Sequence, residues 1–291
     1  YIPPIKRKQD DSVSKKIEDL KLPGVVLIPE TSRDYPEGSM GAKFLGFVDA
    51  QGEGKYGVEG YLNDVLKGEQ GKSISERDIL GRQITVADSK LILPKNGKDV
   101  VLTIDHVIQY MAEEAIKSAV EKHRADSGSV VIMNPKNGDI LALAEYPTYD
   151  PAKYGEVKDY SIFQNMAVAD AYEPGSVFKA LAMAAGIDSG AVTPDTGNYF
   201  EANVKVDGET IWNSQRSAYG YETMTQVLEN SDNVGMVWMI DKLGKDKFYD
   251  YIDAFGFGKP TGVEIEGEAA GLIQDKEDVP RVGVATMAFG Q

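Results

Sequence analysis

The residue composition and the hydrophobic pattern of the chain change near residue 98, and this change constrains the fold more than any other feature. Before it, glycines recur every few residues and no long stretch has helical periodicity, which suits loops and strand ends rather than a bundle of helices. Val25–Ile28 is predicted to be a short buried strand, and Lys95-Asn96-Gly97-Lys98 is a turn signal. Since 291 residues make about two domains, we predict one domain over 1–98 and another over 99–291.

Regular elements are predicted beyond this boundary. Residues 100–104 read as a strand, Asp105 is placed to cap a helix, and apolar residues then recur on one helical face as far as Val120. Two strand-like runs, 129–133 and 139–145, flank a turn and predict a β-hairpin. A helix followed by a hairpin indicates an antiparallel sheet with helices packed on it, so the predicted fold class is α+β.

Composition excludes several classes of protein. The 31 basic and 46 acidic side chains leave a formal net charge of −15, whereas a protein that binds nucleic acid through its phosphates needs a basic face, so no nucleic-acid partner is expected. The absence of cysteine excludes disulfides, thiolate metal sites and cysteine nucleophiles. Both histidines, His106 and His123, fall on the predicted helix, where surface or packing roles are expected.

The most informative segment is Tyr172–Ile187, in which a Pro-Gly turn leads directly into a helix of small and apolar residues. Ser176 is expected at or beside the start of that helix, where free N–H groups and the helix dipole favour a developing anion. Lys179 follows on the same face and can take the hydroxyl proton if burial keeps its amine neutral. The alternative is a helix cap with a solvated lysine. A second Ser-x-x-Lys, Ser12–Lys15, lies in a charged leader with no buried helix behind it.

Ser231-Asp232-Asn233 forms the second candidate element. It lies between the apolar-periodic stretches 223–230 and 234–243, and Gly244 is expected to end the second helix. The tripeptide therefore occupies a corner between two helices, where a hydroxyl and an amide can project into a cleft. Because these residue types also turn chains and cap helices, only the pairing with the Ser176 element gives the tripeptide functional weight.

Together the two elements resemble those of the class B penicillin-binding proteins, the monofunctional peptidoglycan D,D-transpeptidases of the penicillin-recognising serine superfamily. The likeness runs nearly end to end. Strings similar to the family's non-catalytic pedestal are Tyr35–Gly38, Leu45–Val48, Tyr56–Gly60 and Asp78–Arg82. Strings similar to its transpeptidase domain are Leu102–Asp105, Met133–Ala142, Pro147–Pro151, Phe255–Gly258, Gly267–Gly271 and Ala285–Gln291.

The resemblance implies a role for each residue of the two elements. Ser176 would be the acyl-accepting nucleophile and would supply an oxyanion-hole N–H, and Lys179 would be its proton acceptor. Ser231 would relay a proton to the leaving amine, and Asn233 would hold the substrate's amide. Asp232 fills the variable middle position and is grouped with the substrate-binding residues without a firm role. No metal and no cofactor are implied.

The resemblance also implies a fold and a setting. The fold would be an α+β transpeptidase domain, an antiparallel sheet flanked by helices, preceded by a mostly β, elongated pedestal of the dimerisation type over 1–98. The protein would lie on the extracytoplasmic face of the bacterial cell membrane, with an anchor upstream of Tyr1. Stem peptides ending in D-Ala-D-Ala and β-lactams would be its ligands. A lipid-linked glycan polymerase and other cell-wall synthesis proteins would be its partners.

One element of the family pattern, Lys-Thr-Gly or Lys-Ser-Gly, does not occur in the sequence. Lys259-Pro260-Thr261-Gly262 is no substitute, because Pro260 cannot donate to a sheet ladder, and we expect a turn there. In the family the missing element lies beyond the stretch that resembles 285–291. We therefore expect a chain cut at both ends, a catalytic domain without its C-terminal part, and poor acylation by these residues alone.

Two other functions stay open. A D,D-carboxypeptidase or a β-lactamase of the same superfamily would use the same serine, although a pedestal serves no purpose in a small secreted hydrolase. A non-catalytic scaffold for cell-wall synthesis is the third hypothesis. Departures at Ser176 or Lys179 would favour that hypothesis, and the sequence contains none.

Overall fold

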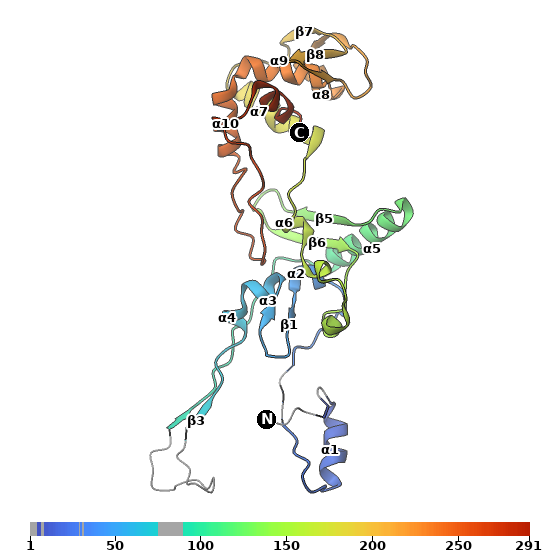
Figure 1. The fold of residues 1–291 in the computed structure, drawn as a ribbon, viewed down its shortest axis with the longest axis vertical. Coiled ribbons are helices and arrows are strands. Elements are labelled where there is room, and N and C mark those ends of the chain that lie inside the picture. Colours follow the sequence, from blue (N-terminus) through green and yellow to red (C-terminus); the bar gives the residue numbers. More distant parts are fainter. Residues whose placement is uncertain (1–4, 7–8, 29, 31, 75–89) are drawn as a thin grey trace. The chain divides into compact units, whose positions relative to one another are not determined.

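The computed structural model describes residues 5–6, 9–28, 30, 32–74 and 90–291. The chain divides into two compact units (Figure 1), the first formed by residues 1–169 with Glu264–Glu268 and the second by Asp170–Val263 with Ala269–Gln291. The boundary predicted between residues 98 and 99 falls inside the first unit and stays a prediction. The string Asp78–Arg82, which resembles the pedestal, lies outside the described residues.

The first part of unit 1 mixes short helices with short strands where the structure describes it, rather than being mostly β. Its elements are α1 (Asp11–Asp19), α2 (Ala42–Leu45), β1 (Phe47–Val48), β2 (Gly54–Lys55), α3 (Gly57–Tyr61), α4 (Asn63–Leu66), β3 (Lys72–Ile74) and β4 (Lys90–Ile92). β1 pairs with β2, and β3 with β4, both antiparallel. Some of the glycines lie where two backbone segments pass close to each other. A Cβ on Gly46 would overlap the Tyr56 carbonyl, and a Cβ on Gly57 would overlap the Phe44 carbonyl.

The prediction of a buried strand over Val25–Ile28 is wrong. This segment has no regular secondary structure, and the side chains of Val26 and Ile28 are 78% and 76% exposed. A short apolar run marks a strand only when a neighbouring strand accepts its hydrogen bonds, and no strand of the described residues pairs with this one.

An aromatic cluster and a buried ion pair explain why the compact unit continues past residue 98. Phe47 stacks on Tyr154 with ring centroids 4.4 Å apart, and the Tyr149 hydroxyl donates to the Ala42 carbonyl at 2.9 Å. Lys43 and Glu145, only 4% and 3% exposed, form an ion pair of 3.2 Å. These contacts join residues on either side of the predicted boundary within one packed body.

The predicted helix and hairpin after residue 104 are confirmed. α5 (His106–His123) begins at Asp105, whose carboxylate accepts from the Val107 and Ile108 N–H groups at 2.9 and 3.0 Å. β5 (Gly128–Met133) and β6 (Ile140–Tyr146) form the antiparallel hairpin (Figure 1). The helix packs on this hairpin through apolar side chains of both, and the unit ends with the short helices η1 (Pro151–Glu156), η2 (Tyr160–Phe163) and α6 (Met166–Ala169).

The strand predicted over 100–104 is wrong. The Val101 side chain is 96% exposed, and the segment touches the hairpin only at its end, through the Thr103 hydroxyl to the Ile140 carbonyl and the Asp105 N–H to the Leu141 carbonyl. Two hydrogen bonds, one from the Thr103 side chain and one from the backbone of the cap residue Asp105, do not form a β-ladder. The β-branched residues alone were therefore not sufficient to predict a strand.

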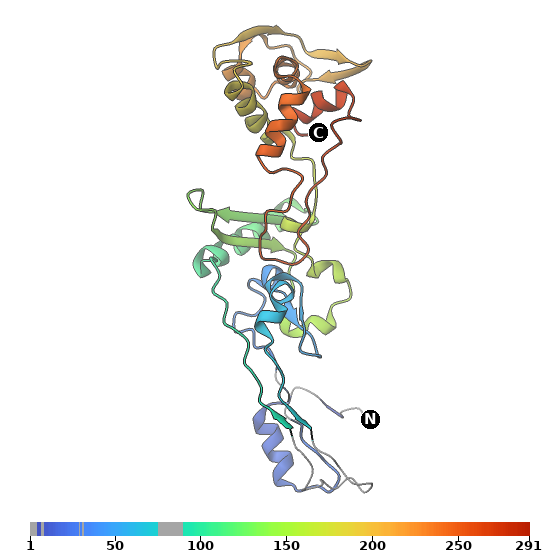
Figure 2. The ribbon, with the colours of Figure 1, turned by 90° about the vertical axis from the view of Figure 1, so that its left-hand side faces the viewer.

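Unit 2 is a group of helices with two strand pairs beside them (Figure 2). The helices are η3 (Gly175–Phe178), α7 (Lys179–Asp188), α8 (Met224–Glu229), α9 (Asn233–Leu243), α10 (Lys245–Ala254) and α11 (Arg281–Met287). β7 (Gly197–Phe200) pairs with β10 (Gly220–Thr223), and β8 (Asn203–Val206) with β9 (Glu209–Trp212), both antiparallel.

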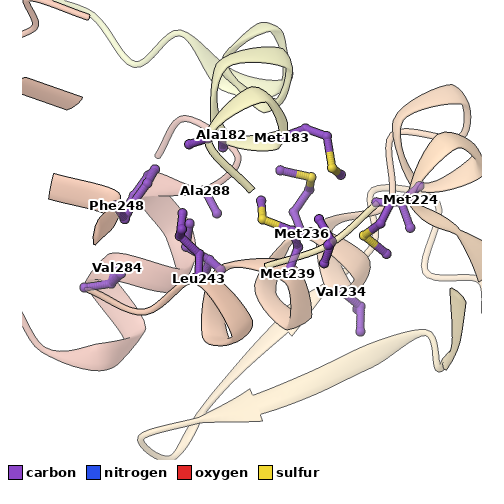
Figure 3. Close-up of a cluster of buried hydrophobic side chains, with 14 of the residues drawn as sticks. Ala182, Met183, Met224, Val234, Met236, Met239, Leu243, Phe248, Val284 and Ala288 are labelled. Carbon is purple, nitrogen blue, oxygen red and sulfur yellow. The ribbon is translucent and has the colours of Figure 1, made fainter. Parts of the chain in front are cut away.

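The core of unit 2 forms around α9, in which seven of the eleven residues are buried; Figure 3 shows several of their side chains. Met183 of α7 gathers with Met236 and Met239 of α9 in one apolar cluster. Gly186 permits this close approach, because a Cβ there would lie 2.5 Å from the Met239 sulfur. The packing fixes the first residue of α7 against the first turn of α9, where both candidate elements lie.

Candidate active site

Ser176 lies in a tight helical turn directly before α7, as predicted. The turn begins at Gly175, whose φ of 63° is left-handed and favours glycine. The Gly175 N–H donates to the Gly290 carbonyl at 3.0 Å, and a Cβ on Gly290 would overlap the Gly175 backbone. The Ser176 side chain is exposed, so its hydroxyl is accessible at the surface of unit 2.

Lys179 is buried although its amine can carry a charge. It is the first residue of α7, it is 2% exposed, and its Nζ lies 6.0 Å from the centre of the Phe289 ring. Burial lowers the pKa of Lys179 to about 8, and the nearby negative charge of Asp232 opposes this change. The buried surroundings that a neutral amine requires are therefore present.

The structure brings Lys179 together with the second element. Its Nζ donates to the Ser231 carbonyl at 2.7 Å, to the Ser231 hydroxyl at 3.0 Å and to the Asn233 side-chain oxygen at 2.6 Å. These partners are 52 and 54 residues away in the sequence. These three acceptors match the three N–H donors of an ammonium group. Among the described residues, no side chain forms a hydrogen bond with the Ser176 hydroxyl.

The predicted corner between two helices is confirmed at Ser231-Asp232-Asn233. α8 ends at Glu229, before the tripeptide, α9 begins at Asn233, its last residue, and Gly244 ends α9 at a φ of 85°. Ser231 has a φ of 54°, a left-handed conformation that costs energy for a residue with a Cβ. The Asp232 N–H donates to the Val227 carbonyl at 2.9 Å, which turns the Ser231 side chain and carbonyl toward Lys179.

Asp232 points inward. Its side chain has no exposed surface, and it accepts from the Gly235 N–H at 2.9 Å as the N-cap of α9. This position supports the corner from inside, and the assignment of Asp232 to substrate binding stays a prediction. The backbone of Gly235 passes close to Val227, whose side chain a Cβ would meet at 2.6 Å.

Sequence reasoning missed Asn213, the residue that holds the corner from outside. Asn213 is 1% exposed, and its side-chain oxygen accepts from the Asn233 and Val234 N–H groups at 3.0 and 3.2 Å. The Asn233 side chain in turn donates to the Trp212 carbonyl at 2.9 Å. A lone asparagine after a short strand carries no pattern, so only the fold could reveal it.

The remaining sequence candidates belong to unit 1, whereas the site belongs to unit 2. Ser12 and Lys15 belong to α1, a helix with no buried residue. His106 and His123 are exposed on α5, as predicted, with His106 Nε2 3.2 Å from the Glu37 carboxylate.

Residues 259–262 lie in an irregular loop after α10, between turns at 255–258 and 266–267, so the expected turns lie on either side of this tetrapeptide and not within it. Within the described part of the chain no group of histidine and acidic side chains is arranged to hold a metal ion. Among the helices described, none has both the length and the apolar content needed to cross a membrane.

The site matches a known family. The Penicillin binding protein transpeptidase domain matches residues 128–291, and the Penicillin-binding Protein dimerisation domain matches residues 4–102. The chain belongs to the class B penicillin-binding proteins. Both candidate elements of this penicillin-binding protein fall inside the transpeptidase match.

Individual relatives cover the whole of this penicillin-binding protein. It is 36% identical to Stage V sporulation protein D of Bacillus subtilis, over 100% of this chain and 45% of that protein. It is 34% identical to the "Probable peptidoglycan D,D-transpeptidase PenA" of Neisseria meningitidis, over 98% of this chain and 49% of that protein. The chain therefore spans about half the length of the curated relatives that it matches.

A solved structure gives the same result for the fold. Penicillin binding protein 3 of Mycobacterium tuberculosis, complexed with aztreonam, superposes with a TM-score of 0.76 at 31% identity, covering 89% of this chain and 54% of that one. The expected fold class, a transpeptidase domain with a dimerisation-type domain before it, is confirmed.

Proposed function

We propose that this penicillin-binding protein is a D,D-transpeptidase that cross-links peptidoglycan stem peptides through an acyl-enzyme on Ser176. One observation carries the proposal: the amine of Lys179 is buried, has a pKa lowered to about 8, and is bonded to Ser231 and Asn233, and Lys179 follows the exposed Ser176 by three residues. The names of the relatives and the aztreonam complex support it.

The proposed first half-reaction assigns one role to each of these groups. The Ser176 Oγ attacks the carbonyl of the penultimate D-Ala, and its proton passes to the neutral Lys179 amine. The bond to the terminal D-Ala breaks, and its nitrogen receives a proton through the Ser231 hydroxyl, which lies 3.0 Å from Lys179 Nζ. The carbonyl carbon remains as an ester on Ser176, and free D-Ala leaves.

The second half-reaction reverses the proton path. An amine of a neighbouring stem attacks the ester, gives its proton to Lys179 by way of Ser231, and forms the cross-link while Ser176 is regenerated. The Ser176 N–H, at the start of the α7 region, would supply one oxyanion donor, which is worth about 3 to 4 kcal/mol in enzymes of this kind. The Asn233 amide would hold the stem peptide after Lys179 rearranges.

The wider setting belongs to the same proposal. The acceptor and donor would be stem peptides ending in D-Ala-D-Ala, β-lactams would acylate the same serine, and a lipid-linked glycan polymerase would be a partner on the extracytoplasmic face of the cell membrane. The net charge of −15 and the family match are compatible with a partner other than nucleic acid.

Covalent trapping tests the proposal. A fluorescent penicillin is incubated with the 291-residue chain and, in parallel, with the full gene product, and the adduct is located by peptide mass spectrometry. We expect one adduct on the peptide that contains Ser176, none in Ser176→Ala, and an unchanged yield in the matched control Ser12→Ala. Labelling that survives Ser176→Ala would refute the assignment of the nucleophile.

The same proteins distinguish a transpeptidase from a hydrolase of the same superfamily. Fast multiple turnover of a chromogenic cephalosporin by the full gene product would favour a β-lactamase, whereas a stable adduct favours the transpeptidase. Rapid, stoichiometric labelling of the 291-residue chain would contradict the expectation that these residues alone acylate poorly.

A further inference from the structure

Two acidic side chains are buried behind the Ser231 corner. Glu222, on β10, is 3% exposed, and Asp232 has no exposed surface. Each carboxyl group has one oxygen with a conventional donor: the Asn230 side-chain amide donates to Glu222, and the Gly235 N–H donates to Asp232. The other oxygen of each, Glu222 Oε2 and Asp232 Oδ2, is buried without a donor among the described residues.

The two carboxyl groups lie within hydrogen-bonding reach of each other. Two neighbouring carboxylates in a buried site repel each other strongly, and neither could satisfy its orphan oxygen with the other. One proton placed between them removes the repulsion and provides the missing donor. A single proton shared between Glu222 Oε2 and Asp232 Oδ2 would give both unpaired atoms a partner.

We propose that Glu222 and Asp232 share one proton, and that this carboxylic acid–carboxylate pair is a positioning device that holds the Ser231–Asn233 corner around Lys179. Glu222 carries the proton and donates a hydrogen bond through it to Asp232, so Asp232 can still accept the hydrogen bond from the Gly235 N–H. The role of the corner in catalysis rests on the proposed function. The protonation of the pair does not.

The surroundings of the pair support this assignment. Burial raises the pKa of Glu222, the Asn230 hydrogen bond opposes this, and contact with the Asp232 carboxylate raises the pKa further. The Tyr219 hydroxyl donates to the Asn230 carbonyl at 3.2 Å and so orders the residue that bonds Glu222. On the opposite side, the charge of Asp232 acts on the Lys179 amine of α7.

The corner needs such support because its backbone is strained. Ser231 holds a φ of 54°, and an ionised Glu222 beside Asp232 would push the cap of α9 away from it. With one shared proton the pair keeps a single negative charge near Lys179. That charge limits how far burial lowers the pKa of the amine.

Infrared difference spectroscopy of the 291-residue chain tests the pair directly. At neutral pH the carbonyl stretch of a protonated carboxyl group is separate from the carboxylate and amide bands. We expect the spectrum of the wild type minus that of Glu222→Gln to contain one such band, and the matched control Glu229→Gln, an exposed glutamate on α8, to give none. The amide introduced by Glu222→Gln keeps a donor for Asp232, so the variant is expected to fold.

Asp232→Asn is the second variant, because asparagine also caps helices well and its amide would donate to an ionised Glu222. We expect it to remove the same band. A wild-type band that both variants leave unchanged, or no protonated band at neutral pH, overturns the proposal.

The pH dependence of unfolding gives an independent readout. A carboxyl group whose pKa is raised by folding stabilises the protein below its unfolded pKa and loses that contribution as pH rises through the folded pKa. We expect this fall in the wild type and in Glu229→Gln but not in Glu222→Gln. Identical slopes in all three contradict the shared proton. Because neither measurement uses acylation, their failure is distinguishable from failure of the proposed function.

Discussion

The lowered pKa of Lys179 predicts a specific dependence of stability on pH. The ordinary value of 10.5 and the value of about 8 in the folded protein differ by about 3 kcal/mol of interaction that disfavours the charged amine. Because folding lowers this pKa, the folded state releases the proton first, and Lys179 costs stability at neutral pH. The cost decreases as pH rises from about 8 toward 10.5.

Replacement of Lys179 isolates this contribution. Lys179→Met keeps an unbranched side chain, one atom shorter and without the charge, so the wild type should gain about 2.5 kcal/mol relative to the variant between about pH 7 and pH 10. Urea unfolding of both proteins at several pH values measures the difference, and titrating groups that do not interact with Lys179 cancel. Lys15→Met is the matched control, because Lys15 lies in the exposed Ser12–Lys15 sequence and its loss removes no buried charge.

The same pKa determines what fraction of the Lys179 amine is neutral and able to act as a base. An amine with a pKa of about 8 is about one-tenth neutral at pH 7, about 300-fold more than one at 10.5. A difference between wild type and Lys179→Met that stays constant across the pH range would show that the buried amine is not shifted. The reasoning that makes Lys179 the proton acceptor would then fail.

Three further changes test the packing of unit 1 and the support of the site in unit 2. Glu145→Ala leaves Lys43 buried without its ion-pair partner and should cost about 3 to 5 kcal/mol in urea unfolding. Glu69→Ala, in the exposed ion pair with Lys95, should cost no more than about 1 kcal/mol. Equal losses of stability in the two variants would contradict the burial argument. Asn213→Ala removes the acceptor of two buried N–H groups and should cost about 1 to 3 kcal/mol; a change within error would contradict its role. Gly175→Ala forces a Cβ into a left-handed residue and should cost about 1 to 2 kcal/mol by thermal or urea unfolding, while Gly155→Ala, whose φ is not left-handed, should be nearly neutral; no difference between them would refute the strain.

Local patterns predicted the elements whose signals are contained in a few neighbouring residues. The Asp105 cap, the hairpin 128–146, the turn before α7 and the corner at Ser231 each contain hydrogen bonds between residues close in sequence, and these leave a local pattern. The strand predicted over 100–104 failed for the complementary reason. A strand requires a partner from elsewhere in the chain, and apolar content does not identify one.

By itself, the sequence determined which groups are available for chemistry and which family the chain resembles. It placed Ser176 and Lys179 one helical turn apart, and it placed Ser231 and Asn233 at a helix corner. Only the tertiary structure decided how these groups are charged. The pKa of Lys179 depends on burial by α9 and on Asp232, and the pair of Glu222 with Asp232 depends on β10 folding against that corner. Desolvation and proximity are properties of distant segments packed together, so no local pattern in the sequence can encode them.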